Sequence, residues 1–197
     1  MKHLSLSILL ILVFSLSWGQ ESALYTKLKD NADYRYAYLQ ENGGVVHEGL
    51  IKDIHEWNRY GDLELIFPSG KRQTFTPKDL AEYRLPDKRY VSDGKRFYEV
   101  AQEGKKVGLY RQLVIKAHSI PSAGGGPAVS SREEVELFYL KKNNEKDFKL
   151  VKKSGFAKTF STYFADCETV RLKIKNKELT DKDFGEIAYL YNKECQK

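Results

Sequence analysis

The chain has 197 residues and a formal net charge of +6, with 33 Lys and Arg residues interspersed among 27 Asp and Glu residues. The longest runs of positive charge are pairs, which are typical of solvated turns and helix faces, so the composition argues against a nucleic-acid-binding protein. Aromatic residues make up 13% of the chain and include 13 Tyr. This favours a sheet-rich fold, in which tyrosine rings pack while their hydroxyl groups stay in water.

Residues 1–19 are predicted to be a signal peptide. A basic residue precedes an apolar run over 4–16, and the small residues Ser17 and Gly19 stand just before Gln20. A membrane anchor is the alternative, but the run is shorter than the roughly 20 apolar residues that span a bilayer. No second hydrophobic stretch follows, and no cysteine lies near the cut. We therefore expect a secreted or periplasmic protein without a transmembrane segment after cleavage.

Residues 30–151 are predicted to form mostly antiparallel strands and hairpins. Apolar and polar side chains alternate through 34–53 and 63–75, and the turns Asn42–Gly44 and Pro68–Gly70 divide each segment into a hairpin. Further strands are expected at 89–92, 96–102, 106–115, 135–140 and 148–151. Between them, 76–83 is expected to form one short helical turn, with Thr76 as its cap and Pro77 at its first position.

Helical spacing replaces strand alternation after residue 153. Four aromatic residues repeat at helical intervals over 156–164, behind a possible cap at Ser154. A second helix is expected over 184–191, where Thr180 and Asp183 resemble a capping box. The segment 168–177 fits either a strand or a helix. The order of elements predicts a single α+β domain over 20–197, strand-rich over 30–151, with two or three short helices over 154–195.

Only two cysteines are present, Cys167 and Cys195. An even number of cysteines in an exported protein predicts one disulfide, and each of these two closes an apolar helical pattern. Two separately buried thiols are the alternative. Cysteines this far apart, with no histidine at ligand spacing, do not form a zinc site.

The glycine-rich segment 118–131 is the stretch that most resembles a binding loop. A phosphate-binding loop needs a lysine after its glycines and a position between a strand and a helix. Here no lysine follows, and strand-like sequences stand on both sides. We therefore interpret it as the mobile tip of a hairpin, with no bound cofactor.

The histidines and carboxylates define no catalytic or metal site. His47 and His55 stand beside Glu48 and Glu56, but strand alternation does not bring these four residues together, so no metal is expected. The chain has no G-x-S-x-G motif and no cysteine expected to be free. A pair of carboxylates could still catalyse glycoside hydrolysis, and Asp166 and Glu99 would be candidates if they proved buried.

Several short pieces of the sequence resemble a family of uncharacterised secreted proteins from Bacteroidota. The residues that carry the resemblance lie between 60 and 195, and they are Phe75, Pro77, Asp79, Leu80, Tyr90, Ser92, Phe97, Val100, Glu103, Gly104, Leu109, Tyr110, Tyr163, Asp166, Cys167, Tyr191 and Asn192. The long glycine loop departs from the family's pattern, where a short connection is expected. The resemblance implies an exported protein and a fold outline, and no catalytic residue.

These features together predict an exported, non-catalytic binding or accessory protein of the cell envelope. Its partner would be an envelope protein or a polysaccharide. The alternative is a hydrolase that acts on envelope polysaccharide through carboxylates. A polar pocket with two carboxyl groups roughly 5–9.5 Å apart would favour the hydrolase, and shallow surface grooves would favour the binding protein.

Overall fold

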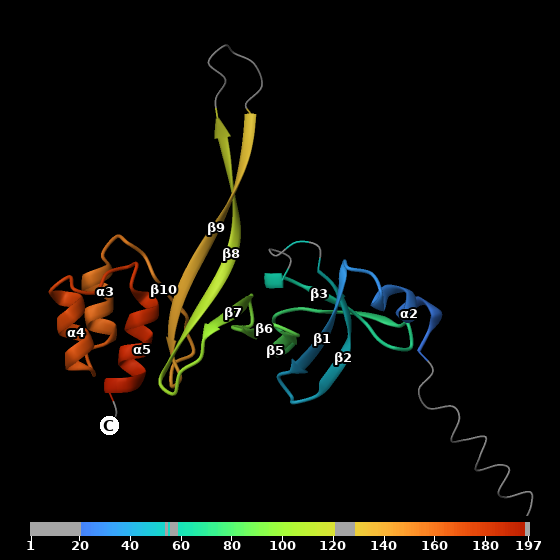
Figure 1. Ribbon diagram of the computed structural model, residues 1–197, viewed down its shortest axis with the longest axis horizontal. Helices are drawn as coiled ribbons and strands as arrows, with labels where there is room; N and C mark the ends of the chain where they lie inside the picture. The colour runs from blue at the N-terminus through green and yellow to red at the C-terminus, as the bar shows by residue number, and fades with distance from the viewer. Residues whose placement is uncertain (1–20, 54, 56–58, 121–128, 196–197) are drawn as a thin grey trace, which may run out of the picture.

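The computed structural model describes residues 21–53, 55, 59–120 and 129–195. Within these ranges, ten strands form one antiparallel sheet in the order β10-β9-β8-β7-β6-β5-β1-β2-β3-β4, with one helix before it in the sequence and three after it (Figure 1). The predicted α+β class is confirmed. The expected signal segment, 1–19, lies outside the described residues. No helix in the described ranges is both long and apolar enough to cross a membrane.

The strands vary in length from two residues to fourteen. The first five are β1 (Tyr34–Glu41), β2 (Val46–Lys52), β3 (Leu63–Ile66), β4 (Arg72–Phe75) and β5 (Leu80–Leu85). The next five are β6 (Lys88–Ser92), β7 (Phe97–Gln102), β8 (Val107–Ile120), β9 (Val129–Lys142) and β10 (Lys149–Leu150). The helices are α2 (Ala23–Lys29), α3 (Phe156–Tyr163), α4 (Glu168–Lys175) and α5 (Phe184–Glu194).

Both hairpins predicted in the first half are confirmed, as β1–β2 and β3–β4. Their turns use Gly44 and Gly70, each with a φ of 84°, a conformation that glycine adopts without strain. Gly49 in β2 is required for a different reason. A Cβ atom there would lie 2.4 Å from the backbone oxygen of Ile66 in β3, so only glycine allows the two strands to approach this closely.

The first five strands curl around a common core. β4 and β5 stand four places apart in the sheet, yet only residues 76–79 connect them. Strands in a flat sheet lie about 4.8 Å apart, so this short connection, which is itself a turn, brings the ends of the curl together. Leu65 and Phe75 accordingly share one core cluster with Tyr83, Tyr90 and Phe97.

The helical turn predicted for 76–83 is wrong. Residues 77–79 form a turn, and β5 begins at Leu80. The carboxylate of Asp79 accepts hydrogen bonds from the backbone N–H of Thr76, at 2.8 Å, and from its hydroxyl, at 2.7 Å. These bonds close a turn, and pairing of β5 with β1 then keeps the chain extended.

Helix α2, which the sequence analysis does not predict, covers the outer side of β2 and β3. The Ser22 hydroxyl caps it by accepting a hydrogen bond from the backbone N–H of Tyr25 at 3.1 Å. Tyr25 and Leu28 pack against Leu50 and Ile66 in a small separate cluster. The helix has only seven residues, which is too short for a clear amphipathic pattern in the sequence.

The strands of the second half follow one another as neighbours, and two of them are much longer than expected. β8 and β9 extend over 107–120 and 129–142, whereas the alternation predicts 106–115 and 135–140. Figure 1 shows that this ribbon projects well beyond the helices on one side and the curled strands on the other. We call its outer part, residues 113–120 and 129–136, the arm.

Helices α3, α4 and α5 pack against the base of β8 and β9 and form a second core. Val107, Leu109 and Leu140 from the strands meet the helical side chains there, among them Phe160 and Ile187. The segment left open between strand and helix is helical, as α4, because its two apolar residues Val170 and Ile174 are both fully buried on one helix face.

The predicted helix caps are only partly correct. Ser154 does not cap α3, which begins after Gly155 in a left-handed conformation with a φ of 70°. Asp183 does hydrogen-bond back to the N–H of Thr180, at 2.8 Å, as in half of a capping box. The regular helix, however, begins only at Phe184, with Asp183 as the N-cap residue.

Candidate functional site

Two adjoining depressions lie along β5, β6 and β7. The larger has a volume of about 460 Å³ and is lined by Arg84, Leu85, Pro86, Asp87, Lys88, Arg89, Glu99, Val100, Ala101, Gln102 and Glu103. The smaller has a volume of about 270 Å³ and is lined by Arg89, Val91, Val100, Glu103, Gly104, Tyr110 and Asn143. Both include Arg89, Val100 and Glu103, so we treat them as one site, the Arg89 hollow.

Strand alternation places the charged residues of the hollow. Tyr83 and Tyr90 are fully buried in the core, so the residues beside them, Arg84 on β5 and Arg89 on β6, face outward. These two arginines stand directly opposite each other in the β5–β6 ladder. Like charges in that position repel, and the pair therefore needs an anion between its members.

Glu82 supplies this anion. Its Oε1 accepts a hydrogen bond from Arg84 Nε at 2.9 Å, and its Oε2 accepts bonds from Arg89 Nε at 2.9 Å and Nη2 at 2.6 Å. Arg89 also pairs with Glu103. Burial opposes the charge on Arg89, but the hydrogen bonds to Glu82 outweigh it and raise the pKa of the guanidinium group. Arg84 further lies over the ring of Tyr38, 5.9 Å from its centroid.

Glu99, one of the two carboxylates singled out in the sequence, is opposite the buried Tyr90 in the β6–β7 ladder. It therefore lines the hollow from the core side of the sheet, with 9% of its surface exposed. It accepts a hydrogen bond from Arg111 Nη2 at 2.7 Å and lies 3.4 Å from Lys88 Nζ. Asp87, at the rim, pairs with Arg35, and that hydrogen bond lowers the pKa of Asp87. The carboxylates lining the hollow, Asp87, Glu99 and Glu103, are thus all ion-paired.

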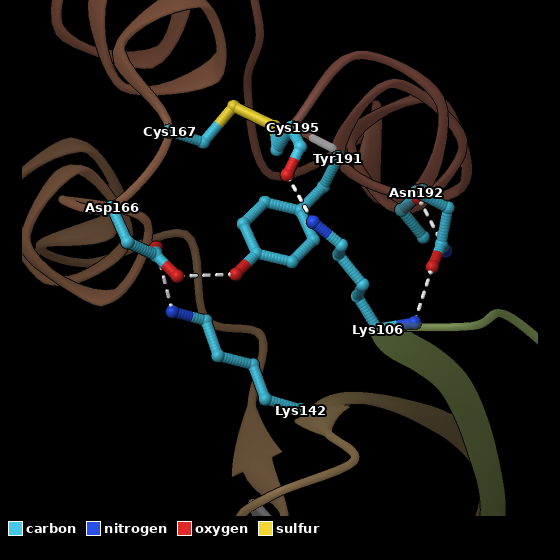
Figure 2. The surroundings of a disulfide bond; sticks show 8 residues. Lys106, Lys142, Asp166, Cys167, Tyr191, Asn192 and Cys195 are labelled. Atoms are coloured by element: carbon cyan, nitrogen blue, oxygen red, sulfur yellow. Dashed lines mark hydrogen bonds and ion pairs between the residues drawn. A yellow bond between two sulfur atoms is a disulfide. The ribbon is translucent and has the colours of Figure 1, made fainter. Parts of the chain in front are cut away.

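The second singled-out carboxylate, Asp166, lies beside the disulfide (Figure 2). It accepts a hydrogen bond from Lys142 Nζ at 2.8 Å and another from the hydroxyl of Tyr191 at 2.5 Å. Burial favours the neutral acid, but the bonds from Lys142 and Tyr191 prevail and lower the pKa of Asp166. Its side chain is 56% exposed, so the buried environment that would make it a general acid is not present.

Cys167 and Cys195 are joined, with their Cα atoms 5.4 Å apart. The bond ties the start of α4 to the end of α5, beside a depression of about 550 Å³ that Lys106, Asp166 and Tyr191 also line. Figure 2 shows Lys106 reaching the backbone oxygen of Cys195. The labelled polar side chains in this view each bond to another part of the chain, which indicates a structural joint.

Asn192 attaches this joint to the sheet. Its Oδ1 accepts hydrogen bonds from the backbone N–H groups of Lys106 at 2.8 Å and Val107 at 3.2 Å, and its Nδ2 donates to the oxygen of Val107 at 2.8 Å. A Cβ atom at Gly104 would collide with the Asn192 side chain. Residues that carry the family resemblance, Gly104, Asp166, Cys167 and Asn192, therefore meet at one place and hold the helices against β8.

The structure places the histidine–carboxylate candidates with other partners. His47 Nε2 lies 2.7 Å from Glu41 Oε1, and Glu48 accepts a hydrogen bond from Tyr36. Glu56 lies outside the described residues. Where side chains are described, no group of three His, Cys, Asp or Glu residues is placed to hold a metal ion.

The glycine-rich segment lies between two paired strands, as predicted. β8 runs to Ile120 and β9 begins at Val129, and these two residues are opposite each other in the ladder. The predicted hairpin is therefore confirmed, and the strand-to-helix setting of a phosphate-binding loop is not found. The tip itself, 121–128, lies outside the described residues, so its expected mobility stays a prediction.

Sequence reasoning did not identify the three residues that organise the hollow, Glu82, Arg84 and Arg89. The alternation of buried and outward-facing residues along β5 and β6 could have indicated them, because each stands beside a residue that the strand buries. The incorrect helical turn over 76–83 hid this alternation at the start of β5. No protein-family model, curated protein or solved structure matches this chain, so a functional proposal rests on the geometry of the hollow.

Proposed function

We propose that the protein is an exported, non-catalytic binding or accessory protein of the cell envelope, and that the Arg89 hollow binds envelope polysaccharide. The observation that carries the proposal is the hollow's balance of fixed charges. Three cationic residues and three anionic residues line it, namely Arg84, Lys88 and Arg89, and Asp87, Glu99 and Glu103.

A hydroxyl-rich ligand suits such a surface. Each sugar hydroxyl both donates and accepts hydrogen bonds, so it can use guanidinium N–H groups and carboxylate oxygens that lie side by side. A strongly charged ligand would meet repulsion from one of the two sets. Tyr38, whose ring centroid lies 5.9 Å from Arg84, adds an aromatic ring next to this lining residue.

The state of the carboxylates supports binding over hydrolysis. A glycosidase needs one carboxylic acid that stays protonated near neutral pH, which requires a raised pKa. Among the described residues, every carboxyl group whose pKa departs clearly from its ordinary value is displaced downward, at Asp79, Asp87, Asp93, Asp166 and Asp183. The expected signal segment and the disulfide support an exported protein.

The test is co-sedimentation of the purified mature protein with insoluble cell-envelope polysaccharide. We expect Arg84→Ala and Glu103→Ala each to weaken binding roughly tenfold, because both side chains reach the hollow while more than half exposed to solvent. The matched controls are Arg72→Ala and Glu64→Ala, which remove an exposed ion pair between β3 and β4. These controls should bind within about twofold of the wild type.

Two outcomes would overturn the proposal. Equal effects of the hollow variants and the control variants would show that the hollow is not the binding surface. Release of new reducing ends from the polysaccharide by wild-type protein, lost on substitution of Glu99, would show that the protein is a hydrolase.

A further inference from the structure

The arm leaves the sheet without a neighbour on either edge. β7 pairs with β8 only as far as Arg111, and β10 pairs with β9 only at Tyr139 and Leu140. Gln112 and Leu113 still contact Phe97 of β7. Beyond them the β8–β9 ladder continues from Val114 to Ile120, which at about 3.4 Å per residue is roughly 20 Å, and no other described strand pairs with this length.

A two-stranded ribbon of this kind is marginal in water by itself. Its two edges expose unpaired backbone N–H and C=O groups, to which another strand can add. The two edges differ in charge. Opposite Leu113–Ala117, the β9 edge carries Arg132, Glu133, Glu134 and Glu136, whereas Lys116 is the one charged residue of this part of the β8 edge.

We propose that the β8 edge pairs antiparallel with the β8 edge of a second copy of this chain, with Ala117 opposite Ala117. Pairing between two β9 edges is less favourable, because three of the four charged residues there are glutamates and like charges opposite each other are destabilising. Pairing centred on Ala117 overlaps residues 114–120 of both copies and stops short of Arg111, where β7 occupies the edge. The result is a closed, two-fold dimer with a four-stranded ribbon.

The register of the arm favours a second copy of this chain as the partner of the β8 edge. Within one arm, Val114 is opposite Val135 and Ile120 is opposite Val129, but Lys116 with Glu133 separates these apolar pairs. Centring on Ala117 places Val114 of one copy beside Ile120 of the other. In backbone register, the Val114–Val135 pair of one copy then continues into the Ile120–Val129 pair of the other, while each Lys116 keeps Glu133 as its cross-strand partner.

Sedimentation velocity of the oxidised mature protein tests the association. A ladder of this length is at the small end of stable interfaces, so we expect a monomer–dimer equilibrium in the micromolar range. Val114→Lys should shift the midpoint at least tenfold toward monomer. The matched control, Leu172→Lys, replaces an aliphatic residue on α4 that is 40% exposed and should leave the equilibrium unchanged. Circular dichroism confirms that both variants fold.

Cysteine cross-linking tests the edge and the register. Ala117→Cys should form a covalent dimer on mild oxidation, because residues opposite each other in a ladder lie within disulfide range, and Glu134→Cys on the β9 edge should not. A single monomeric species up to about 500 μM would overturn the proposal. So would a dimer that Ala117→Cys fails to cross-link, or one that Glu134→Cys cross-links instead. None of these results depends on the Arg89 hollow.

Discussion

Gly49 shows how one residue controls the curl of the sheet. Its Cα faces the backbone of β3, and an added methyl group would lie 2.4 Å from the Ile66 oxygen. Gly49→Ala should therefore lower the free energy of unfolding by about 2–4 kcal/mol, because backbone must move. Gly185→Ala is the control. Nothing lies within 4 Å of its added methyl group, so it should stabilise α5 slightly. Urea unfolding measures both, and equal effects would contradict the close approach.

Lys142 is a nearly buried cation, 8% exposed, inside a cage of aromatic rings. Its Nζ lies 5.0 Å from the ring centroid of Tyr163, 5.2 Å from that of Tyr191 and 5.6 Å from that of Phe164. Lys142→Ala should cost about 3 kcal/mol of unfolding free energy, since it removes both packing and charge.

Lys142→Met separates these two contributions. It keeps most of the aliphatic stem, so only the cation–π and ion-pair part should be lost, about 1–2 kcal/mol. Lys152→Ala, at an exposed position, should be neutral. If Lys142→Ala were as harmless as Lys152→Ala in thermal and urea unfolding, the cage would contribute nothing to stability.

Asp166 makes stability depend on acidic pH. Its folded pKa lies below the value in the unfolded chain, because Lys142 and Tyr191 hydrogen-bond to the ionised form. The stabilisation is therefore complete above about pH 5 and is lost as the pH falls through the folded pKa. Between about pH 6 and pH 3, Asp166→Asn should lose less unfolding free energy than the wild type. Parallel curves for Asp166→Asn and the wild type would contradict this account.

At the scale of single elements, the disulfide holds the helices together. It joins residues 28 apart in the sequence, for which chain-entropy reasoning gives a stabilisation of about 3–4 kcal/mol. The Cys167→Ser/Cys195→Ser double variant should show this loss in urea, and a reducing agent should destabilise only the wild type. Free thiols at both positions in non-reducing peptide mapping of exported protein would contradict the pairing.

Elements with strong local signals could be predicted from the sequence. The hairpins at Gly44 and Gly70 were predicted correctly, because turn residues and the alternation of apolar and polar residues can be recognised within a few positions of the sequence. Elements decided by distant contacts could not. Thr76 and Pro77 favour a helical turn, but pairing of β5 with β1 overrides that preference. The segment 168–177 fitted two patterns, and its burial against the other helices selected the α-helix.

The shape of the whole molecule depends on contacts between residues far apart in the sequence, which no short stretch of sequence can indicate. The curl follows from pairing between β1 and β5, and the length of the arm follows from a ladder that continues past the predicted ends of both strands. The cysteine pair could be predicted because only one pairing of two cysteines exists. The Arg89 hollow could not, because its residues come from three strands whose neighbours in the sheet were unknown.

At the scale of the whole molecule, an intact-mass measurement tests the proposed export. The expected cut precedes Gln20, after the small residues Ser17 and Gly19. Protein recovered from the periplasm or medium should have the mass of residues 20–197 less the two hydrogens lost in the disulfide. A mass that includes residues 1–19 would contradict both the predicted cleavage and the oxidising compartment that the cysteine pair implies.

The central claim is that the Arg89 hollow binds envelope polysaccharide without cleaving it. One measurement tests all three parts of this claim: an NMR titration of isotope-labelled protein with a defined oligosaccharide fragment of that polysaccharide. We predict shift changes concentrated at Arg84, Arg89 and Glu103, with fragment signals that remain intact over the titration. Shift changes confined to the depression beside Cys167 and Cys195, no shift changes at all, or the appearance of shortened fragments would contradict it.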